Sequence, residues 1–448
     1  MAQNISRRQF GALALSGIGT TFLLAGCGTS GTTATSTPPA ASTADAFAQA
    51  NLNFMWWTNP VRTAYTEQIL KNYTAAHPSV TVNPQPGEWA TYWTKLSTMV
   101  AGQNTPDIIQ MDQGFIVEYA DRGALMNMND IGTIDKEPLK STLNEGMIGG
   151  KLYGVPTGNN AYAYCANRTL FDKAGVKLPN DKTWTWTDFQ EISERLAQGS
   201  NGAFAGGEWG AGNGITDLQI WLQQHGELLF TNKGTGYKVS TVESWFQQAK
   251  KFFASSGSVS SSTWVNDSTA SVQQSSFGTN KVAMVGIWSN QIKAYQQANG
   301  GNLILLRPPS VAGTSAKAGM YFKPSMYWSI GATSKYPAQA GALINYFLND
   351  PSAAKLQLVE RGVPANPKIV DLVKPLLSQY DQLGLEYLAN IKDDVSVVPP
   401  LPPKGTSTVG TILGNALENV IYGKSTPSEA AQSFNSQVKS AIAEATNS

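Results

Sequence analysis

Aromatic and short polar side chains follow three predicted strands in the first quarter of the chain. They are Trp56, Trp57 and Asn59 after the first strand, Glu88 after the second, and Asp112 and Gln113 after the third. Indole rings pack on the C–H faces of a sugar, while carboxylates and amides hydrogen-bond its hydroxyls. Because neighbouring strand residues point to opposite faces, one of the two tryptophans should be core, and we favour Trp57 as the ligand-facing one. Asn59 could instead cap a helix, and Glu88 could be a solvated loop acid.

A second group of candidates lies in the middle of the chain. Trp209 and Asn213 belong to the glycine-rich stretch 206–214, and Trp264 and Asp267 lie on a predicted loop. The glycines lack the spacing and the following Lys-Ser/Thr of a phosphate-binding loop, so we expect close backbone packing there. A tryptophan outside a core could stack on a ligand, although about half of the tryptophans are expected to be core residues.

The titratable residues do not form a recognisable catalytic centre. The chain has two histidines and two cysteines, and neither a zinc-site spacing nor a Ser-His-Asp arrangement is evident. Cys165 lies among small and aromatic residues and is predicted to be a buried strand thiol. A glycosidase needs two opposed carboxyl groups, which sequence alone cannot pair, so a secreted carbohydrate-active enzyme remains the alternative. We expect no catalytic residue, metal or cofactor.

Strands and helices alternate in the part of the chain that must position the first candidates. Strands at 52–57, 80–83 and 106–111 are separated by two amphipathic helical patterns, 58–76 and one that ends near Gly102. This order predicts a parallel sheet with right-handed crossovers. Ligands of such sheets bind beyond the carboxyl ends of the strands, which is where the first group lies. Later strands are expected at 161–166, 281–286, 302–306 and 325–332.

The first residues are typical of an export signal. Arg7 and Arg8 precede the apolar stretch 10–24, which is followed by Leu24-Ala-Gly-Cys. At about 15 residues the stretch is shorter than the ~20 that span a bilayer. We predict a signal peptide at 1–26, and a lipidated Cys27 with a flexible tether at 27–48, because the cysteine resembles that of a bacterial lipobox. Sec and twin-arginine export both remain open.

The composition limits the partners and suggests the size of the fold. The 448 residues have a formal charge of +1, only 14% are charged, and 12 are tryptophan. Such a balance does not favour a nucleic acid or an anionic surface as partner. The part beyond the signal exceeds one ordinary hydrophobic core, which predicts two lobes. Low charge with many aromatics suits a neutral, polar, flat-faced ligand.

Short motifs run in a specific order along nearly the whole chain beyond the tether. They are Phe54-Met-Trp-Trp, His77-Pro-Ser-Val-Thr-Val-Asn, Tyr92-Trp-Thr-Lys-Leu, Pro106-Asp-Ile-Ile, Tyr119-Ala-Asp-Arg-Gly-Ala-Leu, Gly150-Lys-Leu-Tyr-Gly-Val-Pro, Asn167-Arg-Thr-Leu-Phe-Asp-Lys-Ala-Gly-Val, Trp184-Thr-Trp-Thr-Asp-Phe, Phe277-Gly-Thr-Asn-Lys-Val-Ala-Met-Val-Gly-Ile-Trp and Arg361-Gly-Val-Pro-Ala-Asn. Their order resembles the extracellular solute-binding proteins of ABC importers, in the branch that includes maltose-binding protein. The chain departs from that pattern at Cys165-Ala-Asn and at Ser325-Met-Tyr.

The resemblance implies an α/β fold of the two-lobed periplasmic-binding-protein type, class II. Each lobe would be a mostly parallel sheet flanked by helices, and hinge strands would join the lobes and let them close on a ligand. The chain would cross between lobes near 158–161, 320–323 and 364–368. The implied lobes are 49–158 with 322–366, and 159–321 with 367–448. A monomer exported to the outer face of the membrane, held only by its lipid, would then deliver a sugar to the permease subunits of an ABC importer.

The resemblance also implies four more site residues. Trp288 follows Val285-Gly-Ile, where members of the family often stack a sugar, and Asn160 lies at the implied hinge. Tyr327 and Arg361 lie near the other crossings. Asn160 could merely shape a turn, and Arg361 could form an interlobe or surface salt bridge.

Overall fold

A computed structural model describes residues 45–212, 214–232 and 234–447. Its contacts divide the chain into Met1–Pro39 and Ala40–Ser448, and all that follows concerns the second unit. The predicted signal peptide, Cys27, Asn213 and most of the predicted tether lie outside the described residues.

The folded domain begins slightly earlier than the tether prediction allowed. Ala46 is buried, and the Phe47 ring stacks on His77 with a centroid distance of 4.0 Å. These residues precede the first strand and already pack on the end of the first helix. The last residues of the predicted tether therefore belong to the fold, because two aromatic side chains give them a packing partner.

The first three long strands form the parallel sheet that the alternating pattern predicts. β1 (Ala50–Trp57) pairs in parallel with β2 (Val80–Gly87) and with β3 (Ile108–Met111). The helices of this region are α1 (Pro60–Ala76), α2 (Trp89–Ala101) and α3 (Ile116–Asp121). The three carboxyl ends therefore meet at one edge of the sheet, which confirms the expected positions of the strand ends.

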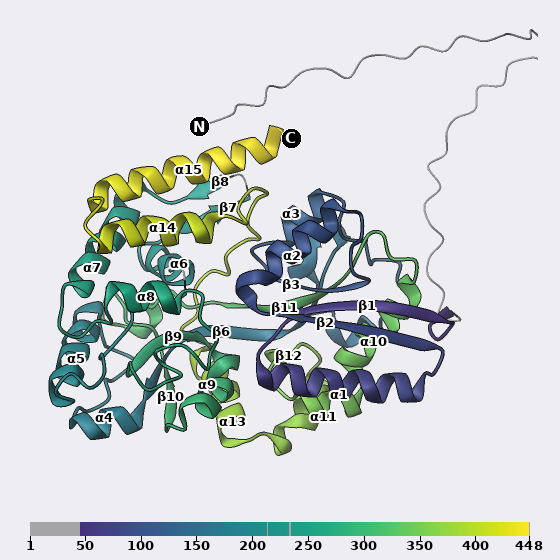
Figure 1. Ribbon diagram of the computed structural model, residues 1–448, viewed down its shortest axis with the longest axis horizontal. Coiled ribbons are helices and arrows are strands. Elements are labelled where there is room, and N and C mark those ends of the chain that lie inside the picture. The colour runs from purple at the N-terminus through teal and green to yellow at the C-terminus, as the bar shows by residue number, and fades with distance from the viewer. Residues whose placement is uncertain (1–44, 213, 233, 448) are drawn as a thin grey trace, which may run out of the picture. The chain divides into compact units, whose positions relative to one another are not determined.

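One long strand, β6 (Val155–Asn167), continues the sheet from one half of the molecule into the other (Figure 1). Its first half pairs with β11 (Phe322–Ile330), and its second half pairs with β9 (Met284–Trp288) and β10 (Leu303–Leu306). All three pairings are antiparallel, as is that between β11 and β3. The half that contains β1 is mostly parallel, as expected, whereas β9 and β10 in the other half pair antiparallel with β6. The sheet is mixed, because β9, β10 and β11 all run opposite to β6.

The remaining elements complete the two halves. The strands are β4 (Met147–Ile148), β5 (Lys151–Leu152), β7 (Leu228–Thr231), β8 (Gly234–Gly236) and β12 (Val363–Pro364). The helices are α4 (Arg168–Ala174), α5 (Trp186–Gly199), α6 (Ile215–Gln224), α7 (Val239–Phe253), α8 (Ser261–Asp267), α9 (Ile292–Asn299), α10 (Pro337–Asn349), α11 (Pro351–Gln357), α12 (Pro367–Val373), α13 (Gln379–Ile391), α14 (Val409–Ile421) and α15 (Pro427–Asn447). The short 3-10 turns are η2 (Glu137–Leu139), η3 (Leu143–Gly146), η4 (Ser289–Gln291), η5 (Ser315–Lys317) and η6 (Lys374–Leu376).

Helices cover both faces of the sheet, so the core divides into separate clusters. In the half that contains β1, Phe54 and Trp56 pack toward α1 and α10, while Met55 and Trp57 pack toward α2 and α3. The alternation of β1 side chains between the two faces produces this division. In the other half, one large cluster joins β6 and β9 to α4–α7, α14 and α15.

Three strands lie side by side where β6 passes between the halves. Ala161 of β6 pairs with Phe322 of β11, and Asn159 pairs with Val363 of β12. These pairings lie at or beside the three predicted crossings. The residue limits of the two lobes stay a prediction. They assign α12 to the C-terminal lobe, but α12 packs on α11 and β12, which they assign to the N-terminal lobe.

Gly158 lets β12 approach β6 closely. A Cβ added there would lie 2.4 Å from the carbonyl oxygen of Val363, so backbone would have to shift. We expect Gly158→Ala to lower the free energy of unfolding by about 1–2 kcal/mol, measured by chemical denaturation. Gly87→Ala in β2 is the matched control, because a Cβ there meets only the Tyr92 ring at 3.8 Å. Equal losses in the two variants would contradict the steric explanation.

Candidate functional site

The side chains of Asp112, Lys323 and Trp288 meet where the two halves join. The Lys323 ammonium lies 3.0 Å from Oδ2 of Asp112 and 4.7 Å from the centroid of the Trp288 ring. Asp112 follows β3, Lys323 belongs to β11, and Trp288 ends β9. The structure thus brings together two residues that the sequence nominated from opposite halves. Lys323, which links them, was missed, although it lies within the crossing expected at 320–323.

Strand register explains why these groups share a face. Tyr162 pairs directly with Trp288, and Asn160 pairs directly with Lys323. Asn160 and Tyr162 are two residues apart on β6, so all four side chains lie on one face of the sheet. The Trp288 ring contacts the rings of Tyr162 at 5.4 Å and Tyr321 at 6.5 Å, both edge-on. The result is an aromatic surface edged with an ammonium, a carboxylate and an amide.

Asn160 makes one of its available hydrogen bonds to Asn290 of η4, which links it to the chain around Glu360. Its Nδ2 donates to Oδ1 of Asn290 at 3.0 Å, and Asn290 in turn donates to the Glu360 carbonyl at 2.7 Å. The Oδ1 of Asn160 is buried and finds no donor in the described part of the chain. An unpaired buried acceptor is uncommon, so Asn160 has capacity left for a hydroxyl donor.

Aromatic rings also gather beyond the carboxyl ends of β1 and β2. Trp57 contacts Trp89 edge-on at 5.1 Å, and Trp93 stacks on Phe115 at 3.6 Å. The sequence analysis missed Trp89 and Trp93. The available signal was their spacing of four residues on a helix that begins directly after Glu88, which places both on one helix face.

Three acidic side chains lie close together in the half that contains β9. Asp217, at the start of α6, accepts hydrogen bonds from the hydroxyls of Tyr162 and Tyr164 at 2.8 and 2.7 Å. Glu208 is 3% exposed, and no ion pair of it is found among the described residues. Burial, together with Asp267 and then Asp217, raises the pKa of Glu208 from 4.5 to about 8. Of these three acids the sequence nominated only Asp267.

The buried Glu208 gives the protein a specific pH dependence. The folded state holds the Glu208 proton up to about pH 8, whereas the unfolded chain loses it near pH 4.5, so the folded state binds more protons in between. Stability from this group therefore falls as pH rises from about 4.5 to 8. We expect Glu208→Gln to remove this slope and to be more stable by up to about 4 kcal/mol at pH 8. Denaturation at several pH values measures it, with the exposed Glu67→Gln as control, and an unchanged slope would contradict it.

Three polar candidates lie at the edge of the sheet with different surroundings. Asn59 caps α1 by accepting the Arg62 N–H at 2.9 Å, and its Nδ2 donates to Glu360 at 2.9 Å, so the capping alternative describes its contacts. Glu88 is exposed at the start of α2 without a side-chain cap bond. Gln113 is half-buried next to Asp112.

Trp57, favoured as the ligand-facing ring, is buried, and so are five other nominated side chains. They are Trp56, Trp209, Trp264, Tyr327 and Arg361. Trp264 belongs to α8 and not to a loop, and its indole N–H donates to the Gly210 carbonyl at 3.1 Å. The Tyr327 hydroxyl donates to the Glu145 carbonyl at 3.0 Å. In this conformation these rings are core residues, because they fill the space between sheet and helices.

Arg361 and Arg62 form a buried polar network around one carboxylate. Glu360 accepts hydrogen bonds from Arg62, Asn59 and Tyr65 at 2.8–3.1 Å. Arg361 donates to the hydroxyl of Tyr65 at 2.6 Å, to Thr66 at 3.0 Å and to Gln110 at 3.1 Å. Burial lowers the pKa of Arg361 to about 10. Arg361 therefore makes buried hydrogen bonds and, among the described residues, no ion pair, so the alternative of an interlobe or surface salt bridge is wrong.

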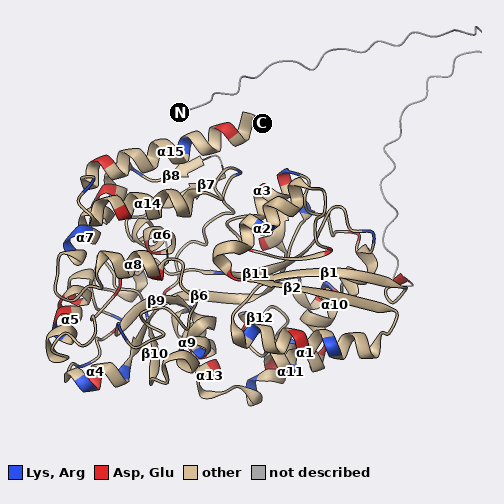
Figure 2. Cartoon of the chain, in the orientation of Figure 1, with Lys and Arg blue, Asp and Glu red and all other residues tan. Residues whose placement is uncertain are grey.

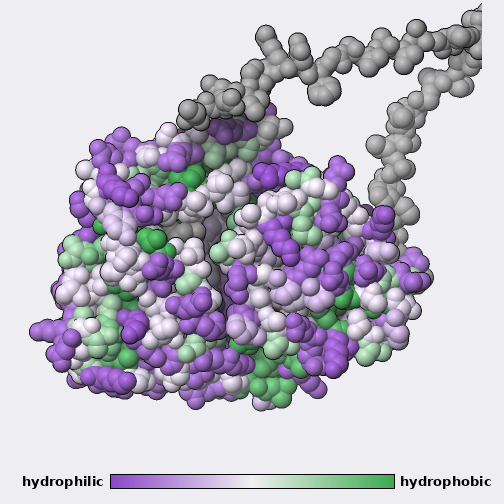
Figure 3. Space-filling view, in the orientation of Figure 1, coloured by the Kyte–Doolittle hydropathy of each residue, from purple (hydrophilic) through white to green (hydrophobic). Residues whose placement is uncertain are grey.

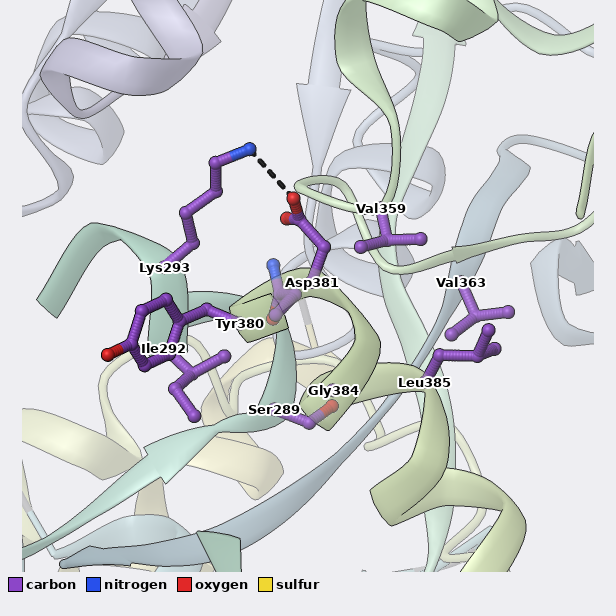
Figure 4. A pocket seen from close by; sticks show the side chains of 10 residues that line it. Ser289, Ile292, Lys293, Val359, Val363, Tyr380, Asp381, Gly384 and Leu385 are labelled. Atoms are coloured by element: carbon purple, nitrogen blue, oxygen red, sulfur yellow. Dashed lines mark hydrogen bonds and ion pairs between the residues drawn. The ribbon is translucent and has the colours of Figure 1, made fainter. Parts of the chain in front are cut away.

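The enclosed pocket beside the hinge is too small for a sugar. Its volume of about 10 Å³ has room for about one water, and it lies between η4, α9, α13 and the residues around β12 (Figure 4). Lys293 and Asp381 pair on its wall at 2.8 Å. A wider groove of about 550 Å³ between the β7–β8 hairpin and α15 is open to solvent. Neither contains a nominated residue.

The described residues also show whether there is a reactive cysteine, a metal-ligand cluster, a membrane-spanning helix or a charged surface. The cysteine described, Cys165, is free and buried, and burial raises the pKa of its thiol. Within 45–447, gaps excepted, no cluster of His, Cys, Asp and Glu is arranged to hold a metal ion. Among the helices described, none is both long and apolar enough to cross a membrane. Charged residues of both signs are scattered over the helices of both halves (Figure 2).

Comparison with known proteins gives consistent results. Residues 68–383 match the family model of the bacterial extracellular solute-binding proteins. A putative binding protein of Brucella abortus is 22% identical over 377 residues, which cover 81% of this chain and 86% of the relative. An extracellular solute-binding protein of family 1 from Alicyclobacillus acidocaldarius is 26% identical with a TM-score of 0.60, over 88% of this chain and 99% of that one.

A second solved structure has a higher TM-score. It is a periplasmic oligogalacturonide-binding protein from Yersinia enterocolitica, in complex with saturated digalacturonic acid. The sequences are 20% identical, the TM-score is 0.77, and the match covers 88% of this chain and 99% of that one. The likeness confirms the expected two-lobed α/β fold.

Proposed function

The chain belongs to the bacterial extracellular solute-binding proteins, and from that premise we propose that it is a lipid-anchored receptor delivering a carbohydrate to an ABC importer. It has no catalytic role in this proposal. The ligand is a mono- or oligosaccharide held between the two lobes, and the partners are the permease subunits that receive the closed, monomeric receptor.

The junction of Asp112, Lys323 and Trp288 is the observation on which the sugar assignment depends. An indole face beside a carboxylate and an ammonium, 3.0 Å apart, offers both the stacking and the hydrogen bonds that a sugar ring needs. The Yersinia protein with a similar fold is described with digalacturonic acid. The space-filling view supports access, because a furrow runs between the two halves (Figure 3).

Hinge closure follows from the way the halves are joined. β6, β11 and β12 pair side by side near Ala161, so a small rotation there moves one half against the other. A ligand that contacts Asp112 from one half and Trp288 from the other stabilises the closed form more than the open form. Binding therefore shifts the population toward the state that the importer recognises.

Calorimetry with a panel of sugars, peptides and polyamines tests the ligand class. At least one sugar should bind and make the protein more compact in solution X-ray scattering. If a peptide or polyamine binds and no sugar does, the proposed ligand class is wrong, but the protein is still a solute-binding receptor. No compaction with any bound ligand would argue against hinge closure.

A carbohydrate-active enzyme is the second candidate, because the raised pKa of Glu208 is a property that a glycosidase acid also needs. However, Glu208 and Asp217 are only 3% and 1% exposed, whereas hydrolysis requires two carboxyls that reach the bond from both sides. Incubation with oligosaccharides should release no new reducing ends. Their release, and its loss in Glu208→Gln, would favour the enzyme.

The membrane anchor in this proposal rests on Cys27 alone. Its place after Leu24-Ala-Gly supports acylation of the thiol and a location on the outer face of the cytoplasmic membrane. Metabolic labelling with a fatty acid should mark the full chain and not Cys27→Ser. Equal labelling of both would contradict the anchor.

A further inference from the structure

The tryptophans are distributed unevenly between core and surface. All twelve lie in the described residues, and nine of them are buried. The three others are Trp288 and Trp93, which are half-buried, and Trp89, which is 45% exposed. A single exposed indole needs no explanation, but Trp89 and Trp93 adjoin each other and Phe115, and an exposed apolar patch of this kind marks a binding surface.

Trp89 is exposed but held in place by other rings. Its ring meets Trp57 at 5.1 Å, Trp93 at 5.4 Å and Phe115 at 6.1 Å, with interplanar angles of 81–86°. Edge-on contacts of this kind fix the orientation of an indole without covering all of its surface. Trp89 is also the first residue of α2, two positions beyond the end of β2, so the helix fixes its backbone. A rigid, exposed indole loses little entropy when a ligand packs on it.

The surroundings of Trp89 are continuous with the candidate site. Phe115, which contacts Trp89, donates its backbone N–H to the Asp112 carbonyl at 3.1 Å. Asp112 pairs with Lys323, and Lys323 lies over Trp288. Two polar residues belong to the same edge of the sheet. Glu88 directly precedes Trp89 in the chain, and Gln113 lies between Asp112 and Phe115. Trp89 therefore lies at the outer end of a series of aromatic and polar groups that begins at Trp288.

We propose that Trp89 is a stacking subsite for an outer sugar ring, so that the ligand is an oligosaccharide with one ring at Trp288 and a further ring at Trp89. This inference rests on the proposed sugar-binding function and adds the length of the ligand and the residue that selects it. A single sugar ring would reach Trp288 without needing Trp89. The exposed indole becomes covered only when the ligand extends along the edge of the sheet.

The test uses homologous series of one to four units: gluco-, galacto-, xylo- and galacturono-oligosaccharides, titrated into the full chain by calorimetry. For the series that binds, affinity should rise at least about tenfold from one unit to the longer members. Trp89→Ala should remove that gain and change monosaccharide affinity less than about twofold, while Trp89→Phe keeps most of it. Phe47→Ala is the matched control, because Phe47 is 51% exposed on the same half, at the opposite end of β1.

Each other outcome overturns the inference in a distinguishable way. Sugar binding without length dependence, or an unchanged gain in Trp89→Ala, removes the subsite and leaves the proposed function standing. A loss of similar size for the monosaccharide places Trp89 in the inner site instead. If no series binds to the intact protein, the proposed sugar function fails and this inference fails with it. Circular dichroism of each variant checks that the fold is retained.

Discussion

Glu360→Gln is expected to lower the free energy of unfolding by about 3–5 kcal/mol. Glu360 is the carboxylate of the buried network, and its ion pair with Arg62, at 2.8 Å, has both side chains 5% exposed. Both carboxylate oxygens of Glu360 accept hydrogen bonds, from Arg62, Asn59 and Tyr65. A glutamine has one acceptor oxygen and one NH2 group, so it cannot accept all of them. The change also leaves Arg62 and Arg361 as two buried cations without a compensating negative charge.

Chemical denaturation monitored by tryptophan fluorescence measures this loss. The matched control is Glu137→Gln, because Glu137 pairs with Lys140 at 2.5 Å while both side chains are more than 70% exposed. An exposed pair of this kind contributes less than about 1 kcal/mol. A similar loss in the two variants would show that the buried network has no special importance for stability.

Trp288→Ala is expected to weaken sugar binding about 30-fold or more, corresponding to about 2 kcal/mol. The indole is the aromatic side chain that the Lys323 ammonium overlies, and its removal takes away the stacking face and the ring that orients that ammonium. Trp288→Phe should have an intermediate affinity, since a smaller ring keeps part of the face. Calorimetry with the sugar identified in the panel gives both values.

Tyr422→Ala is the control for this prediction. Tyr422 is an exposed aromatic of the same half, at the end of α14, with no contact to the candidate site among those described. Its removal should change sugar affinity less than about twofold. An affinity of Trp288→Ala within twofold of the unchanged protein would remove the junction of Asp112, Lys323 and Trp288 as the sugar site.

Local patterns predicted a large part of the fold. The apolar run at 52–57, the alternation at 80–83 and the helical spacing between them identify β1, α1 and β2, because strands and helices bury their side chains at different periods. The rule that ligands lie beyond parallel strand ends then nominated Asp112, which the structure places beside Trp288 by way of Lys323. The same rule did not exclude Trp56, whose burial depends on which face α10 covers.

The sequence by itself determined the strand–helix order, the low charge and the carboxyl ends of the first and third strands at Trp57 and Met111, since each of these depends on residues close together in the chain. Only the tertiary structure decided which tryptophans are core and which are exposed, and that Lys323 lies between Asp112 and Trp288. It also decided that Glu208 is buried without an ion pair among the described residues. The physical reason is that exposure and charge pairing depend on strand register and on packing between segments that are distant in the chain, such as Asp112 and Lys323, which are 211 residues apart.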